Sequence, residues 1–249
     1  MFETEGTFAL FMMIGFVAQL IDGALGMAYG ISATTALIAL GLPPALASAN
    51  VHTAEVFTSA ASGASHMAAK NIDWRLVRRL APAGVLGGIL GTLLVSHLDT
   101  HTARPLIAAY LFYMGLVVLK KAIRPSQAKG KSLRVRVLGF AGGLCDAVGG
   151  GGWGPVVASR LLANGEEPAK TVGSTNLAEF FMTAAVSVTF LFTLGPSFGQ
   201  AALGLVLGGV IAAPIAAFGA RRLPRRGLMG MVGVLICLVS AFNIVTALT

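Results

Sequence analysis

Four acidic residues stand out because each lies inside or beside a long apolar stretch. Asp22 and Asp146 adjoin glycine-rich segments, whereas Glu55 and Glu179 lie within later apolar stretches. A charge in the hydrocarbon of a membrane is costly, so such a residue usually faces a protein interior or a polar cavity. A carboxyl group there can be neutral and can bind or release a proton. We therefore predict that these four residues serve proton coupling or gating. The alternative is that they only cap exposed backbone of broken helices.

A run of four glycines lies at residues 149–152, within the stretch GFAGGLCDAVGGGGWGP at residues 139–155. Such a run can free backbone N–H groups at the start of a following half-helix, where the helix dipole favours an anion. The alternative is that the glycines only permit close helix packing, beside ordinary packed aromatic residues. We favour the anion site. The predicted substrate-binding residues are Gly26, Tyr29, Gly30, Asn50, His52, Gly150, Gly151, Gly152, Trp153, Gly154, Ser174 and Asn176.

The chain contains an internal duplication. Residues 15–30 match residues 139–154 without a gap at a shift of 124 positions. At the same shift residues 47–59 match residues 171–183, so that Glu55 aligns with Glu179. The duplication predicts two repeats, residues 1–124 and 125–249, of which the second begins with a basic linker.

The composition is that of a polytopic membrane protein. Of 249 residues, 55% are hydrophobic and 11% are charged, whereas soluble domains carry about 25% charged residues. The mean hydropathy is +0.80. The apolar segments predicted to form helices are 7–25, 27–42, 45–67, 77–96 and 104–122 in the first repeat, and 134–148, 152–164, 171–194, 199–219 and 227–248 in the second.

The lengths of these segments predict an all-α fold with one broken or re-entrant helix pair at the start of each repeat. A helix needs about 20 residues to cross the hydrocarbon core, and the third, fourth and fifth segments of each repeat meet this length. The second segments, 27–42 and 152–164, are too short. Backbone freed at such a break is tolerated where it is buried in protein or lines a polar cavity.

Loop charges predict that the two repeats have inverted topologies. Of the 18 basic residues, 17 lie in segments 70–79, 120–136, 160–170 and 221–226, which leaves Arg104. By the positive-inside rule these segments are cytoplasmic, and both termini lie outside. Equivalent loops of the two repeats differ in charge, so the repeats are oppositely oriented. Inverted repeats are typical of secondary transporters, whose substrate site lies near the membrane midplane.

The remaining chemistry argues against other classes of protein. The net charge of +8 comes from loops that contact anionic lipid, so no nucleic-acid partner is expected. Asn176 aligns with His52, which leaves too few nitrogen ligands for a zinc site, so neither metal nor cofactor is expected. Cys145 and Cys237 are interpreted as buried apolar residues. The sequence lacks a set of catalytic residues typical of an enzyme.

The stretch DAVGGGGWGPVV, followed by a helix that carries NLAEFF, resembles the sulfite exporter TauE/SafE family, also described as 4-toluene sulfonate uptake permeases. The resemblance covers nearly the whole chain. It implies a transporter of sulfite, organosulfonates or related sulfur-containing anions in the bacterial inner membrane. The first repeat, with GALGMAYGIS, has fewer glycines and no proline after them, which predicts that the second repeat dominates substrate binding.

These observations predict a secondary transporter that exports a small sulfur-containing anion by alternating access, with proton coupling. Two alternatives stay open. One is a passive anion channel with the same site. The other is a cation or metal permease, or an intramembrane enzyme, that uses the four acids.

Overall fold

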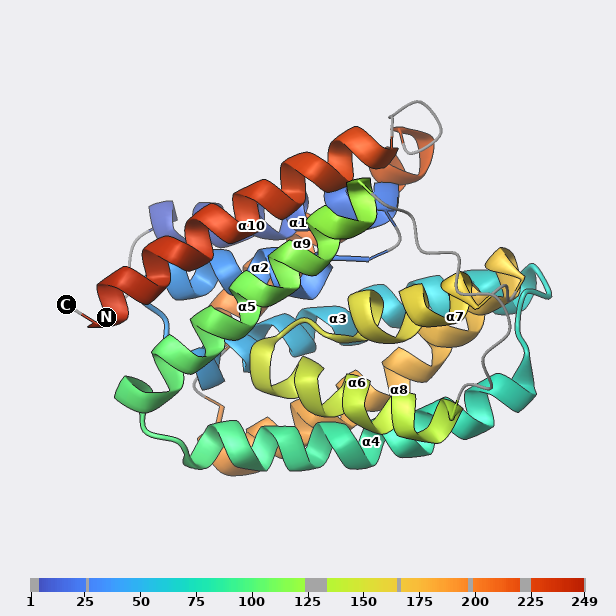
Figure 1. Cartoon of the computed structure of the whole chain (residues 1–249), viewed down its shortest axis with the longest axis horizontal. Helices are drawn as coiled ribbons and strands as arrows, with labels where there is room; N and C mark the ends of the chain where they lie inside the picture. Colours follow the sequence, from blue (N-terminus) through green and yellow to red (C-terminus); the bar gives the residue numbers. More distant parts are fainter. Residues whose placement is uncertain are drawn as a thin grey trace.

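The computed structural model describes residues 5–25, 27–123, 134–164, 167–196, 199–219 and 225–248. The described chain is helical and contains no strand, which confirms an all-α fold. Figure 1 shows the helices, which are α1 (Glu5–Leu25), α2 (Tyr29–Ala39), α3 (Pro44–Ala68), α4 (Trp74–His97), α5 (Thr100–Ile123), α6 (Val135–Gly149), the π-helical turn η1 (Trp153–Ala158), α7 (Ser159–Ala163), α8 (Pro168–Leu194), α9 (Gly199–Gly219) and α10 (Arg225–Leu248).

Four helices within the described residues are long and apolar enough to cross a membrane, and they belong to α4, α5, α8 and α10. Helix α3 has 25 residues but is not among them. Polar residues such as Ser48, Asn50 and His52 lower its hydropathy, and all three are buried. Helix α3 therefore turns this polar face into the bundle. The chain is a polytopic membrane protein, as its composition predicts.

Both predicted helix breaks are present. Helix α1 has 21 residues, about 31 Å of helix, whereas α2 has only 11 residues. In the second repeat α6 ends at Gly149, and the chain resumes as η1 at Trp153 after the glycines. The second helix of each pair is therefore a half-helix that begins inside the protein.

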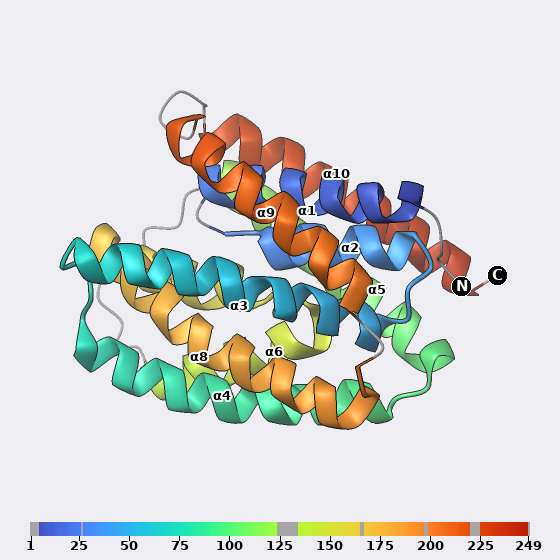
Figure 2. The same ribbon diagram turned by 180° about the vertical axis from the view of Figure 1, so that it is seen from behind.

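Helix packing agrees with a two-fold duplication. Helix α1 packs along α9, and α6 packs along α4, so each repeat places its first element against the fourth element of the other. Helices α3 and α8 pack together, as do α5 and α10. Following the colours in Figures 1 and 2, α3 and α8 run in opposite directions, and so do α4 and α9. These directions are those expected of inverted repeats. The boundaries 1–124 and 125–249 stay a prediction.

Basic residues gather at one end of the bundle, where α4, α6, α8 and α10 begin; we call this the basic end (right in Figure 1). The start of α1 and the end of α10 lie at the opposite end (Figures 1 and 2). Arg104, in the first turns of α5, lies there as well. This distribution matches the predicted loop charges. That the basic end is cytoplasmic stays a prediction.

Candidate functional site: a cavity between the two helix breaks

A cavity of about 330 Å³ lies between the two breaks and helices α3 and α8. Most of the residues predicted to bind substrate or protons line it. These residues are Asp22, Tyr29, Gly30, Glu55, Asp146, Gly151, Gly152, Trp153, Gly154, Asn176 and Glu179. Residues from both repeats thus meet at one site.

Four other predicted substrate-binding residues are described by the structure and do not line the cavity, namely Asn50, His52, Gly150 and Ser174. The Asn50 side chain donates to the Leu46 carbonyl oxygen of its own helix at 2.7 Å. The Ser174 hydroxyl accepts the Asp73 N–H at 2.8 Å. Gly26 lies outside the described residues. His52 and Gly150 lie directly behind the cavity wall and contact residues that form it, as described below.

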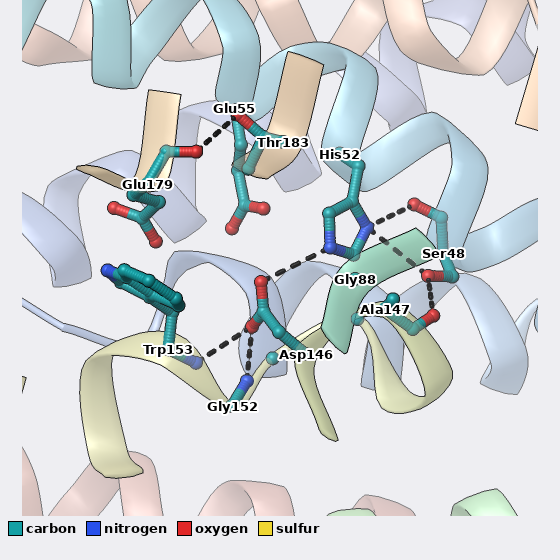
Figure 3. A network of polar contacts seen from close by, with 12 residues as sticks. Ser48, His52, Glu55, Gly88, Asp146, Ala147, Gly152, Trp153, Glu179 and Thr183 are labelled. Carbon is teal, nitrogen blue, oxygen red and sulfur yellow. Dashed lines mark hydrogen bonds and ion pairs between the residues drawn. The ribbon is translucent and has the colours of Figure 1, made fainter. Parts of the chain in front are cut away.

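Asp146 caps the second half-helix (Figure 3). Its Oδ1 accepts the N–H groups of Gly152 and of Trp153, the latter at 2.9 Å. The carboxyl is 2% exposed. Negative charge is stabilised at a helix N-terminus by the unpaired N–H groups and the dipole. Asp146 therefore caps exposed backbone, as the alternative interpretation of the four acids predicts. It accepts two of the backbone N–H groups that the sequence analysis assigns to a bound anion.

Asp22 caps the first half-helix in the same way, but with a single bond. Its Oδ1 accepts the Tyr29 N–H at 3.2 Å. The side chains of the two aromatic residues that begin the half-helices are held by their polar ends. The Tyr29 hydroxyl donates to the Leu205 carbonyl oxygen at 3.3 Å, and the Trp153 indole N–H donates to the Thr175 carbonyl oxygen at 3.1 Å. Both side chains line the cavity, and their hydrogen bonds connect the two half-helices to α9 and α8.

The two breaks are in direct contact, and the contact requires glycine. The Thr34 hydroxyl of α2 donates to the Gly150 carbonyl oxygen at 3.0 Å. A Cβ at Gly30 would overlap that same carbonyl and lie 2.9 Å from Oε1 of Glu55. Gly150 itself has a left-handed φ of 65°, which glycine adopts without strain. These glycines bring the two half-helix starts and Glu55 together.

Glu55 and Glu179 enter the cavity from α3 and α8 (Figure 3). Glu55 is 6% exposed, and its Oε2 has no hydrogen-bond partner among the described residues. Glu179 is half-buried. Asn176, one turn before Glu179, donates to the Ser62 hydroxyl at 2.6 Å. The polar faces of α3 and α8 therefore meet across the cavity, as the repeat alignment predicts.

His52 connects α3 to α6 behind the cavity (Figure 3). Its Nδ1 lies 2.8 Å from the Ser48 carbonyl oxygen, and its Nε2 lies 3.2 Å from Oδ2 of Asp146. The Ser48 hydroxyl donates to the Ala147 carbonyl oxygen at 2.6 Å. Ligand atoms of His52, Glu55 and Asp146 lie within 4.8 Å of one another, so these residues are also the candidate metal ligands.

The cavity extends toward the basic end. On α3 its lining residues run from Glu55 to His66, and on α8 from Val172 to Glu179. Beyond Glu179, toward the opposite end, Met182 is fully buried, and so are Val186 and Phe190 in the next turns. Among the described lining residues four are acidic and none is a lysine or an arginine. The site is therefore polar and rich in carboxyl groups, and it is closed by apolar packing on one side.

Two supporting residues of α5 were not predicted. The Tyr110 hydroxyl donates to the Gly151 carbonyl oxygen at 3.1 Å. Lys121 donates to the Pro155 carbonyl oxygen at 2.6 Å and to the Ser159 hydroxyl at 2.5 Å. The sequence places Lys121 in a basic loop segment, and no local pattern in the sequence indicates that its side chain contacts η1.

Two comparisons with known proteins match most of the chain. The sequence model of the family Sulfite exporter TauE/SafE matches residues 11–243. The chain belongs to this family. It is also 39% identical over 246 residues to "Probable membrane transporter protein YtnM" of Bacillus subtilis (strain 168), an alignment that covers 95% of this chain and 82% of that protein. No solved structure matches the chain. Family and relative together indicate a membrane transporter rather than an enzyme.

Proposed function

We propose that this TauE/SafE family member is a secondary transporter that exports sulfite, an organosulfonate or a related small sulfur-containing anion by alternating access, with coupling to protons. The observation that carries the proposal is the cavity in which the starts of α2 and η1 meet Glu55 and Glu179. Its volume of about 330 Å³ suits a small ligand. The family supports the substrate class.

The anion would bind N–H groups next to the capped ones. The first turn of a helix carries N–H groups without a partner inside that helix, at the positive end of the dipole. In α2 the N–H groups of Gly30 and Ile31 follow the capped Tyr29, and both residues line the cavity. Gly154 has the corresponding position in η1. We assign the oxyanion to these donors, because Asp146 already accepts from Gly152 and Trp153.

Glu55 and Glu179 would couple the anion to protons. An anion and an ionised carboxylate in one buried cavity repel each other strongly, because bulk water screens them little. Binding of the anion therefore favours proton uptake by the glutamates, and loss of the proton favours release of the anion. Anion and proton are thus carried in the same direction, so export is driven by the outward anion gradient against the inward proton gradient. On α3 and α8 these two glutamates are the lining residues farthest from the basic end, and Glu55 is the more buried of the two.

The shape of the cavity favours a carrier over the passive channel. A channel needs a continuous path, whereas alternating access closes one side at a time. The lining residues come from the breaks and from helix segments between the midplane and the basic end. On the other side the fully buried Met182, Val186 and Phe190 occupy the continuation of α8. This arrangement corresponds to a carrier that is open toward its basic end.

Uptake of sulfite, sulfate, taurine, sulfoacetate or thiosulfate into proteoliposomes provides the test. We expect a proton gradient to drive accumulation of a sulfur-containing anion and an uncoupler to abolish it. Glu179→Gln should lower the driven flux at least about tenfold, which corresponds to about 1.4 kcal/mol of coupling free energy. The matched control is Glu167→Gln, the same change at an exposed position that precedes α8.

Three results would contradict parts of the proposal. Flux that only dissipates a gradient and ignores the uncoupler would identify a channel. Unchanged proton-driven flux in Glu179→Gln would remove that residue from the coupling mechanism. If none of the five anions moves in wild-type vesicles, the substrate class is wrong.

A further inference from the structure

We propose that His52, Glu55 and Asp146 form a binding site for a divalent transition-metal cation, such as Zn²⁺ or Mn²⁺, at the deep end of the cavity. One potential ligand atom from each residue lies within 4.8 Å of the other two, and all three residues are buried. Atoms that share a cation at bond lengths of about 2.0–2.5 Å lie at most about 5 Å apart. The spacing therefore fits a shared ion.

The hydrogen bonds of His52 direct a lone pair toward this point (Figure 3). Its Nδ1 lies 2.8 Å from the Ser48 carbonyl oxygen, which can only accept, so Nδ1 carries the proton. In the neutral ring Nε2 is then unprotonated. This is the arrangement of metal-binding histidines, whose second ring nitrogen donates to a backbone carbonyl or a carboxylate. Nε2 faces Oδ2 of Asp146 at 3.2 Å. At this distance the lone pairs of Nε2 and Oδ2 repel each other, so a positive charge must lie beside them.

Asp146 is oriented as a ligand by the helix that it caps. Its Oδ1 accepts the N–H groups of Gly152 and Trp153, which fixes the plane of the carboxyl and turns Oδ2 toward His52. Hydrogen-bonded carboxylates of this kind are typical of metal sites, because the outer bonds hold the ligand in position. The cap and the ligand role are therefore compatible in one side chain.

Glu55 distinguishes a metal cation from a proton. Its carboxyl points toward His52 and Asp146, it is 6% exposed, and its Oε2 has no hydrogen-bond partner among the described residues. In the proton-free state that the proposed coupling cycle requires of Glu55, its buried carboxylate needs a partner of opposite charge. A proton between His52 and Asp146 joins only that pair and leaves Oε2 without a partner. A cation gives all three residues a partner.

The ligand set selects the type of cation. The sequence predicts too few nitrogen ligands for a zinc site, but it does not show that two buried carboxylates meet His52. One imidazole nitrogen with two carboxylates suits Zn²⁺, Mn²⁺, Co²⁺ or Ni²⁺, whereas Ca²⁺ and Mg²⁺ prefer oxygen ligands alone. Glu55 and Asp146 also line the cavity, so the remaining coordination positions face it. One consequence rests on the proposed anion transport: the cation would supply the positive charge for the anion, because the described lining contains no lysine or arginine.

The test is metal binding by the full-length, tag-free protein in detergent after treatment with a chelator. His97 and His101 lie near the α4–α5 junction and could bind metal at the surface, so His97→Gln/His101→Gln serves as the background. In Zn²⁺ titration calorimetry, we expect His52→Gln and Glu55→Gln to weaken binding by about 100-fold or more. Glu167→Gln, the same change at an exposed position that precedes α8, should leave the affinity unchanged.

A second measurement does not depend on the folding of a variant. The X-ray absorption spectrum of the Zn²⁺-loaded background protein should show one imidazole nitrogen and carboxylate oxygens around the ion. A Zn²⁺ shell without an imidazole, or equal Zn²⁺ affinity before and after His52→Gln, would overturn the site. No anion is present in either measurement. Failure of the metal site therefore leaves the proposed anion transport standing, and that transport is tested separately in vesicles.

Discussion

At both helix breaks an aspartate caps the following half-helix, but the two aspartates make different numbers of hydrogen bonds. At the second break, Asp146 accepts two backbone N–H groups and contacts His52. At the first break, Asp22 accepts one N–H, that of Tyr29, at 3.2 Å. A repeat that began as a copy has thus become unequal at its most polar point. The second break is the better fixed of the two.

The backbone shows the same difference. Gly150 adopts a left-handed φ of 65° at the end of α6, where glycine costs little. Ala28 adopts a φ of 104° directly before α2, although it has a Cβ. Its equivalent at the shift of 124 residues is Gly152, whose φ is −136°. The first break therefore stores local strain that the second avoids.

Helices from outside the broken pairs extend the contrast. The second break receives two side chains of α5, since Tyr110 donates to Gly151 and Lys121 donates to Pro155. In the first repeat, Asn243 of α10 donates to the Thr35 carbonyl oxygen at 3.3 Å, more than one turn beyond the start of α2. The comparison predicts that the second break is the fixed part of the site and that the first break moves when access alternates.

The largest expected effect comes from removing the two capping carboxylates. Asp146→Ala leaves two buried N–H groups and His52 without their partner, so we expect a loss of about 3–5 kcal/mol in the free energy of unfolding. Asp22→Ala removes one N-cap bond and should cost about 1–2 kcal/mol. Denaturant unfolding in detergent, with a chelator present, gives both values. Equal losses would show that the two caps do not differ.

Exchange of the backbone types at the breaks gives the next largest effect, and its sign differs between the repeats. Gly150→Ala places a Cβ against the Thr34 hydroxyl at a left-handed φ. We expect a loss of about 1–2 kcal/mol from the dihedral angle and about 1–3 kcal/mol from overpacking.

Ala28→Gly should do the opposite and raise the free energy of unfolding by about 0.5–1 kcal/mol, because relief of the strained φ exceeds the entropy that glycine adds to the unfolded chain. The thermal unfolding midpoints of the two variants in the same detergent provide the check. If Ala28→Gly lowers the midpoint, the angle at Ala28 is not a source of strain.

Much of this site could be predicted from the sequence because the duplication aligns its parts. The shift that superimposes Asp22 on Asp146 also superimposes Glu55 on Glu179, and all four line one cavity. The apolar segments likewise predict every helix. Their starts were less accurate: α5 begins at Thr100 rather than 104, because Asp99 accepts the Thr102 N–H at 2.9 Å and caps the helix. That bond also lowers the pKa of Asp99.

The rest could not be predicted because it depends on contacts between distant segments. The repeat alignment pairs His52 with Asn176. In the structure, Nε2 of His52 instead contacts Asp146, which lies at the second break. Which N–H groups the acids occupy depends on backbone dihedral angles at the breaks. The hydrogen bond from Tyr110 joins α5 to Gly151 in the second break, 41 residues later in the chain, and no spacing in the sequence indicates it.

The smallest effect concerns this support from α5. Tyr110→Phe removes only the hydroxyl that donates to the Gly151 carbonyl oxygen at 3.1 Å, so we expect a loss of about 1 kcal/mol in the free energy of unfolding. Tyr113→Phe on the same helix is the matched control, since its ring is 59% exposed and its loss should be near zero. If the second break owes its rigidity partly to α5, Tyr110→Phe should also increase amide hydrogen exchange at the glycines of residues 150–152, with no change around Tyr29. Exchange that rises equally at both breaks would mean that they move as one unit, and the contrast between a fixed and a moving break would then be wrong.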